Sequence, residues 1–154
     1  MMAEARDAGL HVVAHAGEEG PPEYVWQALD VLGAERIEHG IRSLEDPALV
    51  DRLVRDAIPL TVCPLSNVAL RVVDRLENHP LKRMREAGIR VTINSDDPAY
   101  FGGYIDDNYR EAAAALSLDR ADLVDIARTS IESSFAHEGQ RRAMLDRLRT
   151  ARAR

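Results

Sequence analysis

Four short runs of apolar and β-branched residues alternate with longer segments of helical periodicity, and this alternation limits the chain to few folds. The runs occupy residues 10–16, 36–40, 58–64 and 89–95. Runs of this length separated by helical segments are typical of βα units around a parallel sheet. From residue 105 to residue 154 the pattern is helical. The sequence therefore predicts one α/β domain over residues 1–154, with four strands followed by C-terminal helices.

Polar or titratable residues follow each run, at the point where a strand would meet its loop. In (β/α) barrels this edge of the sheet carries the active site, because the ends of parallel strands meet there. The pattern alone allows an open four-stranded sheet or half of a (β/α)8 barrel, since a closed barrel takes eight strands and roughly 250 residues. In either case we expect six residues to share one pocket: His15, Glu18, His39, Asn67, Asp96 and Asp97.

The composition excludes several classes of protein. The net charge is −6 with acidic and basic residues mixed along the chain, so a nucleic-acid partner is not expected. No apolar run approaches the ~20 residues that span a bilayer, so no membrane association is expected either. The first residues, "MMAEARDAGLHVV", do not form a signal peptide, which predicts a cytoplasmic location. Cys63 is the single cysteine and cannot form an internal disulfide.

The stretch "NSDDP" places Asp96 and Asp97 between an apolar run and a proline. An aspartate before proline commonly opens a turn or a helix, and this is the structural interpretation of the pair. Two adjacent carboxylates also repel each other, and a cation or a hydrogen-bonding ligand would relieve that repulsion. Because neighbouring residues of a strand point to opposite faces, one aspartate can bind a metal ion while the other serves a second purpose.

The stretch "HAGEE" supplies the imidazole of His15 and, three residues later, the carboxyl group of Glu18. Hydrolysis at a metal ion needs a ligand of the first kind and a proton carrier of the second. The stretch "IEHG" adds a second imidazole, His39. Each motif taken alone also has a structural interpretation, namely a polar residue at the end of a strand with its hydrogen bonds satisfied.

Taken together and in this order, "HAGE", "RIEHG", "CPLSN" and "NSDDP" resemble the adenosine/adenine deaminase family of zinc-dependent amidohydrolase barrels. The resemblance extends from about Gly9 to Phe135. It implies that residues 1–154 are the C-terminal half of a (β/α)8 TIM-type barrel whose N-terminal half is absent. The stretch "DDPAYFGGY" is more similar to the branch that deaminates free adenine, and we expect Tyr100, Phe101 and Tyr104 to occupy the space that a ribose would need.

The resemblance also implies a role for each site residue. His15 and Asp96 are similar to zinc ligands, and Glu18 to the acid that protonates N1 of the purine while water attacks C6. His39 resembles the histidine that orients this water and helps to deprotonate it, and Asp97 the residue that hydrogen-bonds N7. The implied reaction is zinc-dependent hydrolysis of a 6-aminopurine, most simply adenine to hypoxanthine and ammonia in purine salvage. Serine and asparagine of "CPLSN" are expected to shape the pocket wall without a catalytic role.

The sequence departs from the family in one respect, because it contains no H-x-H pair. In the family this pair stands on an N-terminal strand and supplies two further zinc ligands. His15 and Asp96 alone fall short of the three protein ligands usual for catalytic zinc. We therefore expect the isolated chain to bind zinc weakly and to be inactive. We also expect two open sheet edges and an apolar barrel interior, through which the half-barrel would associate with itself.

Several alternatives stay open at the level of sequence. The substrate could be adenosine or another aminopurine instead of adenine. The chain could belong to a different metal hydrolase on the same barrel, or it could be a non-catalytic fragment that serves assembly or interaction. Imidazole and carboxylate ligands also suit several divalent metals besides zinc.

Overall fold

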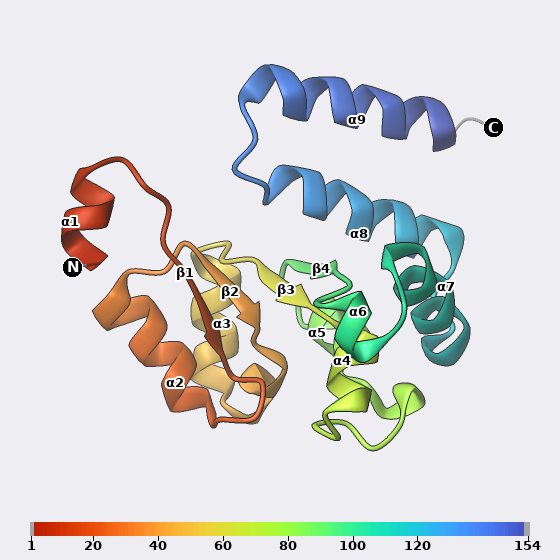
Figure 1. Cartoon of the computed structure of the whole chain (residues 1–154), viewed down its shortest axis with the longest axis horizontal. Helices are drawn as coiled ribbons and strands as arrows, with labels where there is room; N and C mark the ends of the chain where they lie inside the picture. Colours follow the sequence, from red (N-terminus) through yellow and green to blue (C-terminus); the bar gives the residue numbers. More distant parts are fainter. Residues whose placement is uncertain (1, 153–154) are drawn as a thin grey trace.

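One parallel sheet organises the protein, and a computed structural model describes residues 2–152 of it (Figure 1). Its strands are β1 (Val13–Ala16), β2 (Arg36–His39), β3 (Leu60–Val62) and β4 (Val91–Ile93). They are hydrogen-bonded in the order β1-β2-β3-β4, and each pair is parallel. Each strand lies inside one of the four ranges predicted from the sequence and is shorter than that range. At β3 the reason is Pro64, which has no N–H to donate to the ladder and instead begins a helix.

Helices connect the strands and follow the last of them. Those between strands are α2 (Pro22–Gln27) with its π-helical continuation η1 (Ala28–Leu32), the 3-10 segment η2 (Ile41–Glu45), α3 (Pro47–Arg55), α4 (Pro64–Ala69), the 3-10 segment η3 (Leu76–Asn78) and α5 (Leu81–Glu86). After β4 come α6 (Pro98–Phe101), α7 (Ile105–Leu116), α8 (Arg120–Glu132) and α9 (Glu138–Arg152), and α1 (Met2–Asp7) precedes β1. Two of these helices, α1 and α4, were not predicted from the sequence. The predicted helix that runs to Arg154 ends in two residues that lie outside the described range.

Asp46 determines where α3 begins. Its Oδ1 accepts hydrogen bonds from the backbone N–H groups of Ala48 and Leu49, at 2.9 and 3.3 Å, and Pro47 stands at the first helical position. The other carboxylate oxygen accepts from the indole N–H of Trp26 at 2.8 Å. The cap therefore also ties α3 to α2.

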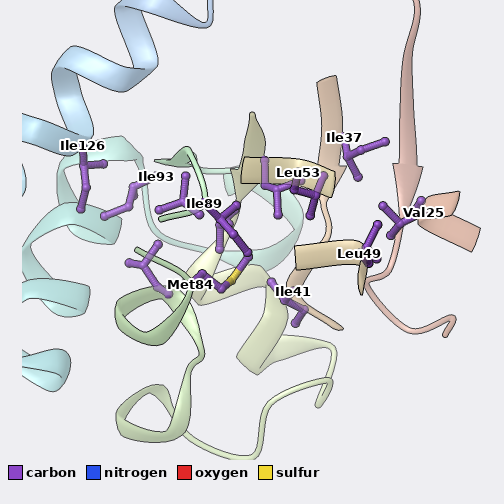
Figure 2. Packing of buried hydrophobic residues seen from close by; sticks show 14 of the residues in the cluster. Val25, Ile37, Ile41, Leu49, Leu53, Met84, Ile89, Ile93 and Ile126 are labelled. Carbon is purple, nitrogen blue, oxygen red and sulfur yellow. The ribbon is translucent and has the colours of Figure 1, made fainter. Parts of the chain in front are cut away.

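The sheet has one apolar face, which packs against the helices. Alternate strand residues such as Ile37, Leu60, Val62 and Ile93 are fully or almost fully buried. Leu49 and Leu53 of α3, Met84 of α5 and Ile126 of α8 pack into the same cluster (Figure 2). This is the usual way in which a parallel sheet buries its apolar surface. Figure 1 shows α8 beside the sheet near β4 and α9 lying along α8. Of the helices in residues 2–152, none is sufficiently long and apolar to cross a membrane.

The opposite face of the sheet is polar, which corrects the expectation of an apolar barrel interior. Arg36 and Glu38 of β2 form an ion pair at 2.9 Å, and the hydroxyl of Thr61 donates to Glu38. On β4 the hydroxyl of Thr92 accepts a hydrogen bond of 2.7 Å from Asn94. The reason is the two-residue period of a strand, which sends every second side chain to this face.

Candidate functional site

Backbone hydrogen bonds hold the segments that follow the strands against their neighbours in the sheet. Gly40 donates to the carbonyl of Ala16 at 3.0 Å, and Arg42 donates to the carbonyl of Gly17 at 2.9 Å. At the same edge of the sheet, the backbone N–H of Asn94, which follows β4, donates to the carbonyl of Val62 in β3 at 2.8 Å. These bonds extend the parallel ladder beyond the strands. They bring side chains that follow β1, β2 and β4 to one edge, as the strand-end pattern predicts.

His39 lies at the centre of the group that results. Its Nδ1 is 3.2 Å from Oε1 of Glu18, and its Nε2 is 3.9 Å from Oδ2 of Asp96. The imidazole ring of His15 lies beside it, with ring centroids 5.2 Å apart. His39 itself is buried, whereas His15 is exposed on the described surface. Three other predicted site residues, His15, Glu18 and Asp96, therefore surround His39.

The backbone is strained at two of these residues. His39 has φ of 68° and Asp96 has φ of 57°, in the left-handed region that residues other than glycine seldom adopt. Gly40 continues the turn with φ of 66°. Positive φ at a non-glycine residue costs about 1–3 kcal/mol and is concentrated at functional sites. Here it turns the side chains of His39 and Asp96 away from the strand direction and towards each other.

Burial shifts the ionisation of both catalytic candidates. Burial, together with the neighbouring carboxylate of Asp96, raises the pKa of Glu18 above 4.5, although a hydrogen bond from Asn67 works in the opposite direction. Burial lowers the pKa of His39 below 6.5, against the opposing effect of Asp96. A carboxyl group with a raised pKa holds its proton nearer to neutral pH, and an imidazole with a lowered pKa stays neutral. The pair therefore has the ionisation of a proton donor beside a proton acceptor.

The two buried polar residues of "CPLSN" contact the site directly. The hydroxyl of Ser66 donates to Oδ2 of Asp96 at 2.6 Å, and the amide Nδ2 of Asn67 donates to Oε1 of Glu18 at 2.8 Å. Both side chains are completely buried. From the sequence, Asn67 was expected in the pocket, and both residues were expected only to shape its wall. Their direct contacts depend on α4, which Pro64 initiates immediately after β3 and which turns both side chains inward.

Asp97 does not join this group. Its Oδ1 accepts hydrogen bonds from the backbone N–H groups of Ala99 and Tyr100, at 3.0 and 3.1 Å, and so caps α6. The two interpretations of "NSDDP" thus apply to different residues. Asp97 is the helix cap, and Asp96 faces His39 and Ser66.

The donor atoms available for a metal ion are imidazole nitrogens, carboxylate oxygens and one thiol. Those of His39, Cys63 and Asp96 lie within 4.8 Å of one another. Burial, helped by nearby carboxylates, raises the pKa of the Cys63 thiol to about 12, so it is protonated at neutral pH and is a poor ligand in that form. His15, the ligand expected from the sequence, is not part of this compact trio. It lines the same cavity as Asp96, however, so imidazole and carboxylate donors suitable for zinc face one space.

This cavity has a volume of about 330 Å³ and lies over the polar face of the sheet. Its wall comes from all four strands and from the C-terminal end of α8. The residues that contribute most to its chemistry are His15, Glu38, His39, Thr61, Asp96 and Ser130. A cavity of this kind, with a few converging polar groups and shifted ionisation, is the usual setting for a small-molecule site.

A model of a protein family described as "Adenosine deaminase" matches residues 1–151. The chain belongs to this family. The family that the four motifs indicated is therefore confirmed. Its relatives include an adenine deaminase of Cupriavidus necator, 58% identical over 135 residues, an alignment that covers 88% of this chain and 38% of the relative.

Solved structures agree with this assignment. The crystal structure of an adenine deaminase from Arthrobacter aurescens superposes with a TM-score of 0.97 at 50% identity, over 99% of this chain and 47% of that one. An amidohydrolase from Burkholderia ambifaria, solved with bound Zn, superposes with a TM-score of 0.85 at 28% identity, over 99% of this chain and 45% of that one. The chain therefore spans less than half the length of these relatives. The predicted fold, the C-terminal half of a (β/α)8 barrel, is confirmed.

Proposed function

We propose that this chain is the C-terminal part of a zinc-dependent deaminase that hydrolyses adenine to hypoxanthine and ammonia. The observation that supports it most is the meeting of Glu18, His39 and Asp96 at one edge of the sheet, with a proton donor and a proton acceptor 3.2 Å apart. The adenine deaminases among its relatives favour this substrate. Half of a barrel does not make a whole site, so the activity is proposed for a full-length form in which these residues stand in a closed barrel.

His15 and Asp96 are the residues of this chain that would hold the metal ion. Bound zinc would lower the pKa of a water molecule to about 7 and so supply a nucleophile at neutral pH. The hydrogen bond from Ser66 orients the carboxylate of Asp96, as groups behind a ligand commonly do. Two more ligands are expected from the N-terminal half of the barrel.

Glu18 and His39 would carry the protons of the reaction. Water attacks C6 of adenine while Glu18 donates a proton to N1, so that the ring accepts the electron pair. His39 accepts the proton that the water loses. The amino group takes up the proton held by His39 and leaves C6 as ammonia, and the new hydroxyl at C6 returns a proton to Glu18, so that the products are hypoxanthine and ammonia. The raised pKa of Glu18 favours the protonated carboxyl group that can donate, and the lowered pKa of His39 favours the neutral imidazole that can accept.

Asp97 and the aromatic residues after it would determine which purine is accepted. One oxygen of Asp97 caps α6, which leaves Oδ2 as the atom that would hydrogen-bond N7. Tyr100 is 80% exposed and its ring meets that of Phe101 edge to face, with centroids 4.9 Å apart. With Tyr104, which is also exposed, these rings would occupy the space of a ribose. Free adenine is therefore proposed in preference to adenosine.

Steady-state kinetics on a full-length form tests the proposal. We expect kcat/KM to be higher for adenine than for adenosine, and removal of zinc with a chelator to abolish turnover. No release of ammonia from adenine would contradict the proposed reaction. A preference for adenosine would contradict the proposed role of the aromatic residues and leave the deaminase intact.

The 154-residue polypeptide on its own provides a second test. Because it supplies His15 and Asp96 but no H-x-H pair, we expect less than stoichiometric zinc after dialysis and little or no turnover. Elemental analysis and an ammonia-release assay measure both quantities. Tightly held zinc in a 1:1 ratio together with rapid turnover would show that the chain makes a complete site by itself.

A further inference from the structure

His79 is a buried histidine to which the proposed reaction assigns no task. It lies between η3 and α5, with 3% of its surface exposed. The backbone N–H of Leu81 donates to its Nδ1 at 3.1 Å. A backbone amide can only donate, so Nδ1 is unprotonated and the proton of the neutral ring is on Nε2. Burial lowers the pKa of His79 to about 4, which keeps the ring neutral at pH 7.

The protonated nitrogen of His79 fixes the orientation of Asn67. Nε2 lies 3.2 Å from Oδ1 of Asn67, so the imidazole donates and the amide oxygen accepts. The amide nitrogen must then point the other way, and it lies 2.8 Å from Oε1 of Glu18. A carboxylate oxygen accepts, so the two ends of the network require the same orientation of the amide.

The backbone around Asn67 holds this arrangement in place. Its N–H donates to the carbonyl of Cys63 at 2.9 Å, and its carbonyl accepts from Val72 and Val73 at 3.0 and 3.1 Å. The side chain is completely buried. An amide inside such a network has no freedom to rotate without leaving a buried polar atom unpaired, which costs about 1–3 kcal/mol. The network is therefore rigid from Leu81 to Glu18.

We propose that His79 and Asn67 are positioning residues that hold Oε1 of Glu18 and leave its Oε2 as the oxygen that hands the proton to the substrate. Among residues 2–152, Oε1 faces both Asn67 and His39, whereas Oε2 has no hydrogen-bond partner. A fixed donor on one oxygen selects which oxygen carries the proton. The donor is also uncharged, so it orients the carboxyl group without the strong stabilisation of the anion that arginine or lysine would bring. The inference rests on Glu18 being the proton donor of the proposed deaminase.

Kinetic measurements on variants of a full-length form test this hydrogen-bond relay, by which we mean the network from His79 through Asn67 to Glu18. In Asn67→Ala and His79→Leu we expect kcat for adenine to fall about 10- to 100-fold, with KM changed by less than about 3-fold, because Glu18 acts in the transition state. His79→Gln should recover most of kcat, since its amide nitrogen can donate to Oδ1 of Asn67 in place of Nε2. The double variant should lose no more than Asn67→Ala alone, because both act through one hydrogen bond. Asn78→Ala, which removes an amide donor to Asp74 at the surface, is the matched control.

The tautomer of His79 gives a readout that does not depend on turnover. Nitrogen NMR of the wild-type protein should place the ring proton on Nε2 and keep it there from about pH 6 to 8. A proton on Nδ1, unchanged kcat in Asn67→Ala, or additive losses in the double variant would each overturn the relay. If His79→Leu does not fold, Asn67→Ala and His79→Gln carry the kinetic test. Absence of adenine turnover in the wild type would instead overturn the proposed function, and the catalytic role of the relay with it.

Discussion

The hydroxyl of Ser66 donates to the carboxylate of Asp96 across 2.6 Å, which links the first turn of α4 to the loop after β4. Ser66 is completely buried, and no water reaches its hydroxyl to replace the bond. A carboxylate oriented in this way presents its other oxygen in a defined direction. The contact therefore joins two sequence motifs, "CPLSN" and "NSDDP", that lie 30 residues apart.

Ser66→Ala is expected to weaken zinc binding by a full-length form by about 10- to 100-fold, because Asp96 loses the group that orients it. Competition with a chromophoric chelator measures the affinity. Ser95→Ala is a close control, since the hydroxyl of Ser95 contacts the backbone carbonyl of Asp96 and not its carboxylate. Equal losses in both variants would mean that the carboxylate contact has no special importance.

Glu18→Gln should lower kcat for adenine by about 100- to 10,000-fold, the usual contribution of a general acid. The raised pKa of Glu18 also predicts that the Glu18→Gln variant is more stable than the wild type at pH 7. A carboxyl group whose pKa is higher in the folded state stabilises the fold below the unfolded pKa of 4.5, and this contribution is lost as pH rises through the folded value. At pH 7 the charge is thus a cost to folding that glutamine removes.

Thermal unfolding near pH 7 should accordingly give a higher Tm for Glu18→Gln than for the wild type. Glu19→Gln is the control, because this neighbour is exposed. A lower Tm for Glu18→Gln, with Glu19→Gln unchanged, would mean that the contacts of the carboxylate stabilise the fold more than its burial destabilises it.

Acid should destabilise the protein through His79. Burial lowers the pKa of His79 from 6.5 to about 4. Between these values the unfolded chain binds a proton that the folded chain excludes, so the free energy of unfolding declines as pH falls, by up to about 3 kcal/mol. Urea denaturation of the wild type and of His79→Gln at about pH 7.5 and about pH 5 measures the difference. The variant should lack this part of the pH dependence, and identical slopes would contradict the assignment.

Two substitutions at Asp97 separate its cap from its proposed contact with the purine. Asp97→Ala should destabilise the protein by about 1 kcal/mol through loss of the cap of α6. Asp97→Asn keeps an oxygen for the cap and should retain stability, yet it should raise KM for adenine. Urea denaturation measures the stability of both variants, and steady-state kinetics measures their KM for adenine. Unchanged KM in Asp97→Asn would leave Asp97 with the cap as its only role.

Much of the site could be predicted from the sequence because strand ends of parallel sheets converge by geometry alone. His15, Glu18, His39 and Asp96 were brought together in this way. The roles of Ser66, Asn67 and His79 could not be predicted, because a buried polar side chain is defined by its partner, and each partner comes from a different segment. Pro64 was also ambiguous, since a proline that stops a strand is equally suited to the first turn of a helix.

The left-handed backbone of His39 and Asp96 is a further feature that no pattern of residue types discloses. The polar inner face of the sheet, in contrast, is present in the sequence as strict alternation at Arg36, Glu38, Thr61 and Thr92. The apolar residues that alternate with them, such as Ile37 and Leu60, give each run its overall apolar character.

The division of the sheet into an apolar and a polar face determines which kinds of genetic change the chain can survive. A point substitution on the polar face alters chemistry and leaves the helix-packed face intact. Insertion or deletion of one residue within β2, β3 or β4 would exchange the two faces beyond that point, turning Glu38 or Thr92 towards the helices and Ile37 or Ile93 towards the polar face. Specificity in this lineage is therefore expected to diverge by replacement within strands, and length to vary in the loops.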